Sequence, residues 1–281
     1  DTTGHTLLGV YRMLIDDAFR KAIVANIKDP VVKMFWVDDY ENYDLRFRKE
    51  IIAPVQNKVG QLLTSPQMRN IVGQPKSSVD FGFVMDNKRI LLANLSKGKV
   101  GEDKSNLLGS AIITKMYLSA LERQNQPEEQ RKDFYLYIDE FQNFSTDIFP
   151  SILSEARKYR LNLNIAHQYL YQLPDSIKHA VFGNVGTVIS FRTGSYDAKE
   201  LAEEMKPVFT SEDLEHLDNH HIALRLLIDG KMSHAFSAIT MPPLKTSGYE
   251  ADRETILRIS RERYATPRDI VEEKLQNWFE K

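Results

Sequence analysis

The sequence predicts an α/β fold with a mostly parallel sheet, set between a small all-helical region and a helical tail. Three patterns lead to this prediction. Strand-like and helix-like segments alternate in the middle of the chain, apolar residues recur at helical spacing before them, and a charged helical pattern follows them. We place the three regions at residues 1–76, 77–243 and 244–281.

The composition bounds the class of protein. The chain has 281 residues, of which 42% are hydrophobic and 27% charged, as is usual for a globular protein. The net charge of −2 gives no overall basic signal for nucleic acid, although a ring-shaped motor can bind DNA with a few loops alone. The absence of cysteine excludes disulfides and cysteine-based metal or thiol chemistry.

Residues 6–72 have the pattern of several helices and of no strand. Apolar residues recur at helical spacing, and Asp29-Pro30 interrupts the pattern. The longest predicted helix covers residues 43–63 and contains Pro54, which indicates a kink or a new start. This region is therefore expected to be a small all-helical domain.

The pattern changes at Ser77, where β-rich and helical segments begin to alternate. A β-hairpin is predicted at residues 79–85 and 89–95, and a second one closes the region at residues 221–227 and 232–239. Between them the sequence predicts helices at 105–123, 149–159 and 196–205, and strands at 134–138, 161–166 and 186–192.

Two carboxylates follow the central predicted strand. Phe134–Ile138 is a run of five apolar residues, and Asp139 and Glu140 come directly after it. In open α/β sheets ligands bind at the carboxyl ends of the strands. An Asp there can hold Mg²⁺ through water, and an adjacent Glu can orient or deprotonate an attacking water, which is the Walker B arrangement of ATPases. The alternative is that acids end this strand because they are well solvated.

An arginine and a glutamine follow at suggestive positions. Arg157 lies at the end of a predicted helix, where it could reach the active site of a neighbouring subunit, or could simply complement the helix dipole. Gln168 follows the next predicted strand, where a polar side chain can touch the γ-phosphate or the attacking water.

Together these segments resemble the ATPase core of conjugative coupling proteins, the DNA pumps of conjugation and type IV secretion in the FtsK/HerA motor superfamily. The resemblance extends over residues 79–240 and implies a RecA-like P-loop NTPase core. It implies ATP and Mg²⁺ as ligands, with Asp139 binding the metal, Glu140 catalytic, Arg157 acting on the neighbouring subunit and Gln168 sensing hydrolysis. Arg192 is a further candidate for a phosphate or interface role. The segments that carry the likeness are residues 90–98, 107–109, 137–141, 154–163, 166–168, 172–173 and 186–192.

One motif of that family is missing. The sequence has no G-x-x-x-x-G-K-[ST] phosphate-binding loop, the Walker A motif. The nearest string, Gly98–Ser105, has its glycines at the wrong spacing and contains Glu102 and Asp103, so we interpret it as a surface loop that ends in a helix cap. We expect the true motif upstream of Asp1, in which case this chain is a C-terminal fragment that is inactive alone.

The sequence therefore predicts part of an ATP-driven DNA-translocating motor. The expected partners are single- or double-stranded DNA, other copies of the chain in a hexameric ring, and a membrane anchor or secretion-channel proteins reached through segments absent here. The expected location is cytoplasmic, with membrane association through a missing N-terminal segment. Two alternatives stay open: a duplex-DNA pump of the HerA/FtsK type, and an ATPase-derived scaffold that recruits proteins without hydrolysis.

Overall fold

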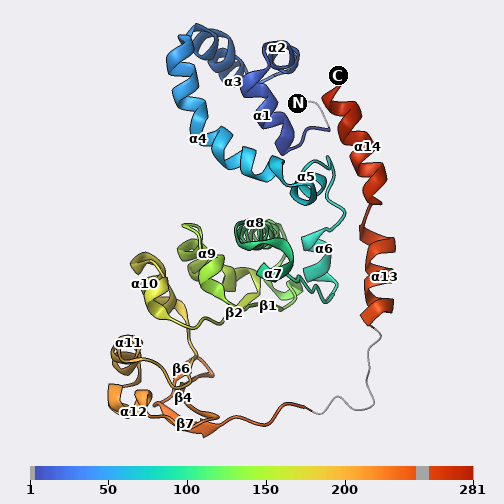
Figure 1. The fold of residues 1–281 in the computed structure, drawn as a ribbon. Coiled ribbons are helices and arrows are strands. Elements are labelled where there is room, and N and C mark those ends of the chain that lie inside the picture. The colour runs from blue at the N-terminus through green and yellow to red at the C-terminus, as the bar shows by residue number, and fades with distance from the viewer. Residues whose placement is uncertain (1–3, 245–252, 281) are drawn as a thin grey trace. The chain divides into compact units, whose positions relative to one another are not determined.

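The computed structural model describes residues 4–244 and 253–280. The chain forms two compact units, which are described separately (Figure 1). One unit combines Asp1–Asp80 with Ala251–Lys281, and the other is Phe81–Glu250. The start of the chain at Asp1-Thr2-Thr3 and part of the predicted tail, residues 245–252, lie outside the described residues.

The first unit is all-helical in its described part, which confirms the prediction for residues 6–72. No described helix in either unit is both long and apolar enough to cross a lipid bilayer. The helices of this unit are α1 (Leu7–Ile15), α2 (Asp17–Ala25), α3 (Pro30–Met34), the π-helix η1 (Phe35–Asp39), the 3₁₀ helix η2 (Tyr40–Asn42), α4 (Leu45–Thr64), α5 (Pro66–Val72), α13 (Arg253–Tyr264) and α14 (Arg268–Phe279).

Local capping explains where these helices begin. The side chains of Asp16, Asp29, Asp44 and Ser65 accept hydrogen bonds from backbone N–H groups in the first turns of α2, α3, α4 and α5. Proline opens α3 and α5, where its missing N–H costs nothing. Pro54 lies inside α4, as the sequence predicted.

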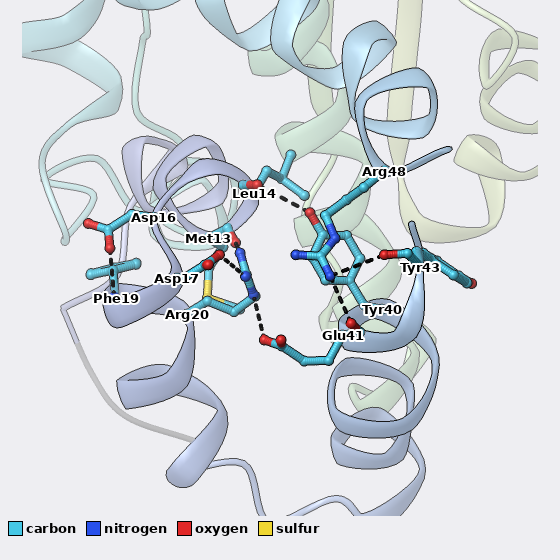
Figure 2. A network of polar contacts seen from close by, with 10 residues as sticks. All are labelled: Met13, Leu14, Asp16, Asp17, Phe19, Arg20, Tyr40, Glu41, Tyr43 and Arg48. Carbon is cyan, nitrogen blue, oxygen red and sulfur yellow. Dashed lines mark hydrogen bonds and ion pairs between the residues drawn. The ribbon is translucent and has the colours of Figure 1, made fainter. Parts of the chain in front are cut away.

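A buried arginine connects α2 to the segment after η1 (Figure 2). Arg20 is 1% exposed, and its guanidinium donates to the carboxylates of Asp17 and Glu41 and to the backbone oxygen of Met13. The same guanidinium lies 5.0 Å from the centre of the Tyr40 ring. A buried charge is tolerated only with such partners, so loss of either carboxylate should destabilise this unit.

The C-terminal helix α14 packs against α1, α2 and α5. The Trp278 ring meets the Phe19 ring edge-on at 5.7 Å, and the Arg12 guanidinium lies over both rings at 5.3 and 4.6 Å. A small apolar cluster adds Leu8, Val271 and Leu275. The predicted tail is therefore helical in its described part and contacts the N-terminal helices, while the division into three domains stays a prediction.

The second unit alternates helices and strands. Its helices are α6 (Phe81–Asp86), α7 (Lys97–Val100), α8 (Glu102–Glu122), η3 (Arg123–Asn125), η4 (Glu128–Gln130), η5 (Phe141–Asn143), α9 (Phe149–Glu155), η6 (Ala156–Tyr159), η7 (Leu170–Gln172), α10 (Asp175–Asn184), α11 (Ser195–Met205) and α12 (Ser211–Glu215). Its strands are β1 (Phe134–Ile138), β2 (Leu161–Ile165), β3 (Val188–Ser190), β4 (His221–Arg225), β5 (Leu227–Ile228), β6 (Lys231–Met232) and β7 (Phe236–Ile239).

The predicted parallel sheet is present as β1 and β2. The two strands pair in register from Phe134 opposite Leu161 to Ile138 opposite Ile165. One face packs on the main apolar core, to which α8 and α9 contribute (Figure 1). The other face of β1 presents Tyr135 and Tyr137, which are exposed.

A second sheet has the order β3-β4-β7 and is antiparallel. Its core is a separate cluster that includes Ala198, Ala202 and Met205 of α11. The predicted closing hairpin is confirmed by β4 with β7 and by β5 with β6. The strand predicted at 186–192 forms at its centre, but its partner is the antiparallel β4.

The hairpin predicted at residues 79–95 is wrong. Residues 81–86 form α6, and residues 89–95 form no sheet hydrogen bonds in the described part of the chain. Val84 and Met85 are buried, and Asp86 forms an ion pair with the buried Arg123. Tertiary contacts of one helical turn have overridden the β propensity of this segment.

Candidate functional site

The ends of β1 and β2 are held together by backbone hydrogen bonds. The N–H of Ala166 donates to the oxygen of Ile138 at 2.9 Å, and the N–H of Phe141 donates to the oxygen of Ala166 at 2.8 Å. Between these bonds Glu140 adopts a left-handed conformation with φ 52°. A left-handed backbone is uncommon for a residue with a Cβ and costs about 1 kcal/mol or more, so the surrounding contacts fix this turn.

Glu140 is held by two side-chain amides. Gln168 donates to Oε1 at 2.7 Å and Gln142 donates to Oε2 at 2.6 Å. These two bonds, from Gln142 first and then Gln168, lower the pKa of Glu140, and the charges of Lys97 and His167 lower it further. The structure therefore brings together Glu140 and Gln168 as the sequence suggested. Gln142 was missed, although a polar residue two positions after the acid was visible.

Asp139 lies beside this pair with its side chain exposed. Its Oδ1 accepts from the N–H of Glu140 at 3.0 Å. No group of three or more His, Cys, Asp or Glu residues gathers around a metal-sized space in residues 4–244 and 253–280. Asp139 is an exposed carboxylate, of the kind that can act as a single protein ligand to a magnesium ion whose other ligands are waters and phosphates.

The Gly98–Ser105 string does not form a phosphate-binding loop. Residues 97–100 make the short helix α7, and Gly101, with φ 89°, precedes the first residue of α8. Lys97 is committed to local partners, because its Nζ donates to Glu102 at 2.6 Å and to Asn143 at 2.9 Å.

The two arginines lie apart from this cluster. Arg157 is on η6 with an exposed side chain, for which no partner is found in the described part of the chain. Arg192 is exposed and reaches Asn219 at 3.5 Å, the limit of a hydrogen bond. Neither bonds to Glu140 among the described residues, so any catalytic role for them requires a second subunit or a bound nucleotide.

Two further titratable groups were missed by the sequence analysis. Asp197, in the first turn of α11, is 4% exposed and accepts the N–H of Leu170 at 2.9 Å. His167 lies in the electric field of both Asp197 and Glu140. Burial lowers the pKa of His167, and the two negative charges, Asp197 first, act in the opposite direction.

The fold of the α/β unit matches that of RecA-like P-loop NTPase cores. Among solved structures, the chain is similar to the bacterial conjugative coupling protein TrwB (TrwBΔN70, unbound monoclinic form), with 13% identity and a TM-score of 0.56. A complex of the plasmid coupling protein TrwB with the non-hydrolysable GTP analogue GDPNP gives 12% identity and a TM-score of 0.53. Each match covers 85% of this chain and 64% of the TrwB chain.

A weaker likeness is to the genome packaging NTPase B204 from Sulfolobus turreted icosahedral virus 2 in complex with AMPPCP. Its identity is 17% and its TM-score 0.37, over 60% of this chain and 74% of that one. No family model matches the chain, and no curated protein matches it. The two TrwB matches confirm, at the level of the fold, the resemblance to coupling proteins seen in the sequence.

Proposed function

We propose that this chain supplies the hydrolytic half of an ATP-driven DNA-translocating motor of the coupling-protein type. The observation that carries the proposal is the Glu140 carboxylate, fixed by Gln142 and Gln168 beside an exposed Asp139 at the ends of two parallel strands. A purely structural role for the Glu140 carboxylate and its two amide partners is disfavoured. The turn is strained, and holding a carboxylate near the surface buries no apolar area.

Asp139 would hold Mg²⁺, which supplies positive charge to the substrate phosphates when it is bound. Glu140 stays ionised at neutral pH and keeps lone pairs beyond those taken by the two amides, so it can orient a water and accept its proton. Gln168 spans Glu140 and the loop after β2, and is suited to report the state of the site to that loop.

In this proposal the phosphate-binding loop comes from residues outside this sequence, which contains no G-x-x-x-x-G-K-[ST] string. In the described part of the chain β1 hydrogen-bonds to β2 alone, so its outer edge has backbone groups available for another strand. The chain also spans less than two thirds of the TrwB chains that it matches. We therefore expect the chain alone to hydrolyse ATP very slowly or not at all.

Arg157 is proposed to act on the site of a neighbouring subunit in a hexameric ring. Its side chain is exposed and uncommitted among the described residues. An arginine that reaches a neighbouring active site stabilises the charge of the transition state. We propose that Arg192 contributes to the same interface or binds a phosphate. We further propose that the complete protein acts on single- or double-stranded DNA, contacts secretion-channel proteins and associates with a membrane.

Two other functions are retained. A duplex-DNA pump of the HerA/FtsK type would use the same hydrolytic residues and differ only in the DNA that stimulates it. A scaffold without hydrolysis is favoured by one observation, the absence of a phosphate-binding loop in this sequence. The scaffold would not need Glu140 to be held by two amides.

The test is ATP hydrolysis by the complete protein, without DNA and with single-stranded or duplex DNA. Asp139→Asn should lower DNA-stimulated turnover by a factor of about 100 and raise the Mg²⁺ concentration needed for half-maximal rate. Asp147→Asn, an exposed acid on the same segment, is the matched control. Stimulation by duplex DNA alone would favour the HerA/FtsK-type pump. Nucleotide binding without turnover in the wild type and both variants would favour the scaffold function.

A further inference from the structure

The loop after β2 holds Gln168 between two fixed points. The first is Ala166, whose N–H and C=O are both bonded to the end of β1. The second is Leu170, whose N–H donates to Oδ2 of Asp197 at 2.9 Å. Only three residues separate these points, and Gln168 is the middle one. The direction of its side chain toward Glu140 is therefore set by both ends of this short span.

The Asp197 carboxylate is buried but only partly hydrogen-bonded. It is 4% exposed, and its second oxygen, Oδ1, has no hydrogen-bond partner in the described residues. Burying a carboxylate oxygen that has no hydrogen-bond partner is unfavourable, and an Asn would accept the same N–H. A carboxylate makes a stronger hydrogen bond to a backbone N–H than a side-chain amide does. Asp197 therefore fixes the position of Leu170 more strongly than Asn would, at some cost in the stability of the fold.

α11 provides a second contact with the same loop. The ring of Tyr196, next to Asp197, meets the ring of Tyr171 edge-on at 6.4 Å, and Tyr171 in turn contacts Tyr169 at 5.5 Å. The rest of α11 packs into the core of the antiparallel sheet. A displacement of α11 would thus be transmitted to both sides of Leu170.

We propose that Asp197 is a positioning residue that sets Gln168 against Glu140 by holding the N–H of Leu170, and so couples α11 and the antiparallel sheet to the hydrolytic site. This hydrogen bond from Leu170 to Asp197, here called the tether, lies within this chain. Its effect on turnover rests on the proposed function.

The tether is tested first by amide hydrogen exchange on this chain. The Leu170 amide should be protected in the wild type, and Asp197→Ala should speed its exchange by about tenfold or more, since bonds to charged acceptors are among the stronger ones. Asp197→Asn keeps an acceptor and should retain most of the protection. Glu128→Gln, which removes an exposed acid on η4, is the control and should leave Leu170 unchanged.

Turnover of the complete protein tests the coupling. Asp197→Ala should lower kcat by about tenfold with KM for ATP nearly unchanged, and Asp197→Asn should restore most of the rate. In a Gln168→Ala background, Asp197→Ala should cause less than about a twofold further loss, because residues that act through each other are not additive.

Three results would overturn the proposal. They are an unprotected Leu170 amide in the wild-type chain, a full additional loss in the Gln168→Ala background, or a change in KM alone. The first result requires no variant, so the proposal stays testable even if Asp197→Ala fails to fold. If the complete protein hydrolyses nothing while Leu170 is protected and released by Asp197→Ala, the proposed function fails and the tether stands.

Discussion

Gly109 allows α8 to pack closely on the segment that follows Glu140. A Cβ added at Gly109 would lie 2.3 Å from two ring carbons of Phe144 and 3.1 Å from Cδ1 of Leu95. Phe144 is 9% exposed and belongs to the main core, so its ring has little room to move. For Gly109→Ala, overpacking costs about 1–3 kcal/mol and better helix propensity returns about 1 kcal/mol. We therefore predict a net destabilisation of about 1 kcal/mol.

The assay must report on the α/β unit. Both tryptophans, Trp36 and Trp278, lie in the helical unit, so hydrogen exchange of peptides from α8 and β1 at increasing urea is the suitable measurement. Gly183→Ala is the control, because Gly183 is an exposed residue of α10 with no atom within 4 Å of an added Cβ. It should stabilise by up to about 1 kcal/mol. If Gly109→Ala proved as stable as Gly183→Ala, the packing argument would be refuted.

Three further predictions concern the tail and the subunit interface. Trp278→Ala should lower the free energy of unfolding of the helical unit by about 2 kcal/mol, because it removes a partly buried aromatic contact of α14. Hydrogen bonds from Asn70 and Arg268 lower the pKa of Glu272, so its contribution is present above its ordinary pKa of 4.5 and is lost as pH falls through the folded-state value. Acid titration should therefore loosen α14 below about pH 4.5. Arg157→Ala should leave the fold intact and lower turnover of the assembled protein by about a thousandfold.

The predictions for Trp278, Glu272 and Arg157 are each checked against a control variant. Tryptophan fluorescence in urea follows the tail variant, with Ile270→Ala, at an exposed residue of α14, as control, and equal stability of the two variants would contradict the packing. Glu272→Gln should flatten the acid titration of the tail, and an unchanged titration would exclude Glu272 as its cause. Lys158→Ala is the control at the interface, and equal rates for both basic-residue variants would argue against a specific arginine.

Much of the candidate site could be predicted because it depends on local sequence. The run of five apolar residues predicted the strand β1, although its Tyr135 and Tyr137 face is exposed, and Asp139 and Glu140 follow it directly. Gln168 follows the next strand, and the ends of parallel strands meet at one edge of a sheet. The pairing of β1 with β2 therefore brought Glu140 and Gln168 together without further information.

The rest depends on long-range contacts that no local pattern encodes. Residues 81–86 have strand-like composition but form a helix, because Met85 and Asp86 are fixed by the core and by Arg123. Asp197 lies 27 positions from Leu170, and only the packing of α11 on the loop brings them within hydrogen-bond distance. The docking of α14 on the first helices spans almost the whole chain, so its aromatic contacts were equally invisible.

We propose that Glu140 activates the water that attacks ATP. The most direct test compares Glu140→Gln with the wild type in DNA-stimulated ATP hydrolysis by the complete protein, with nucleotide affinity measured in parallel and with Glu129→Gln, an exposed acid on η4, as control. We expect a loss of about a hundredfold or more in kcat, with nucleotide still bound and the control unaffected. Turnover by Glu140→Gln at the wild-type rate would contradict it.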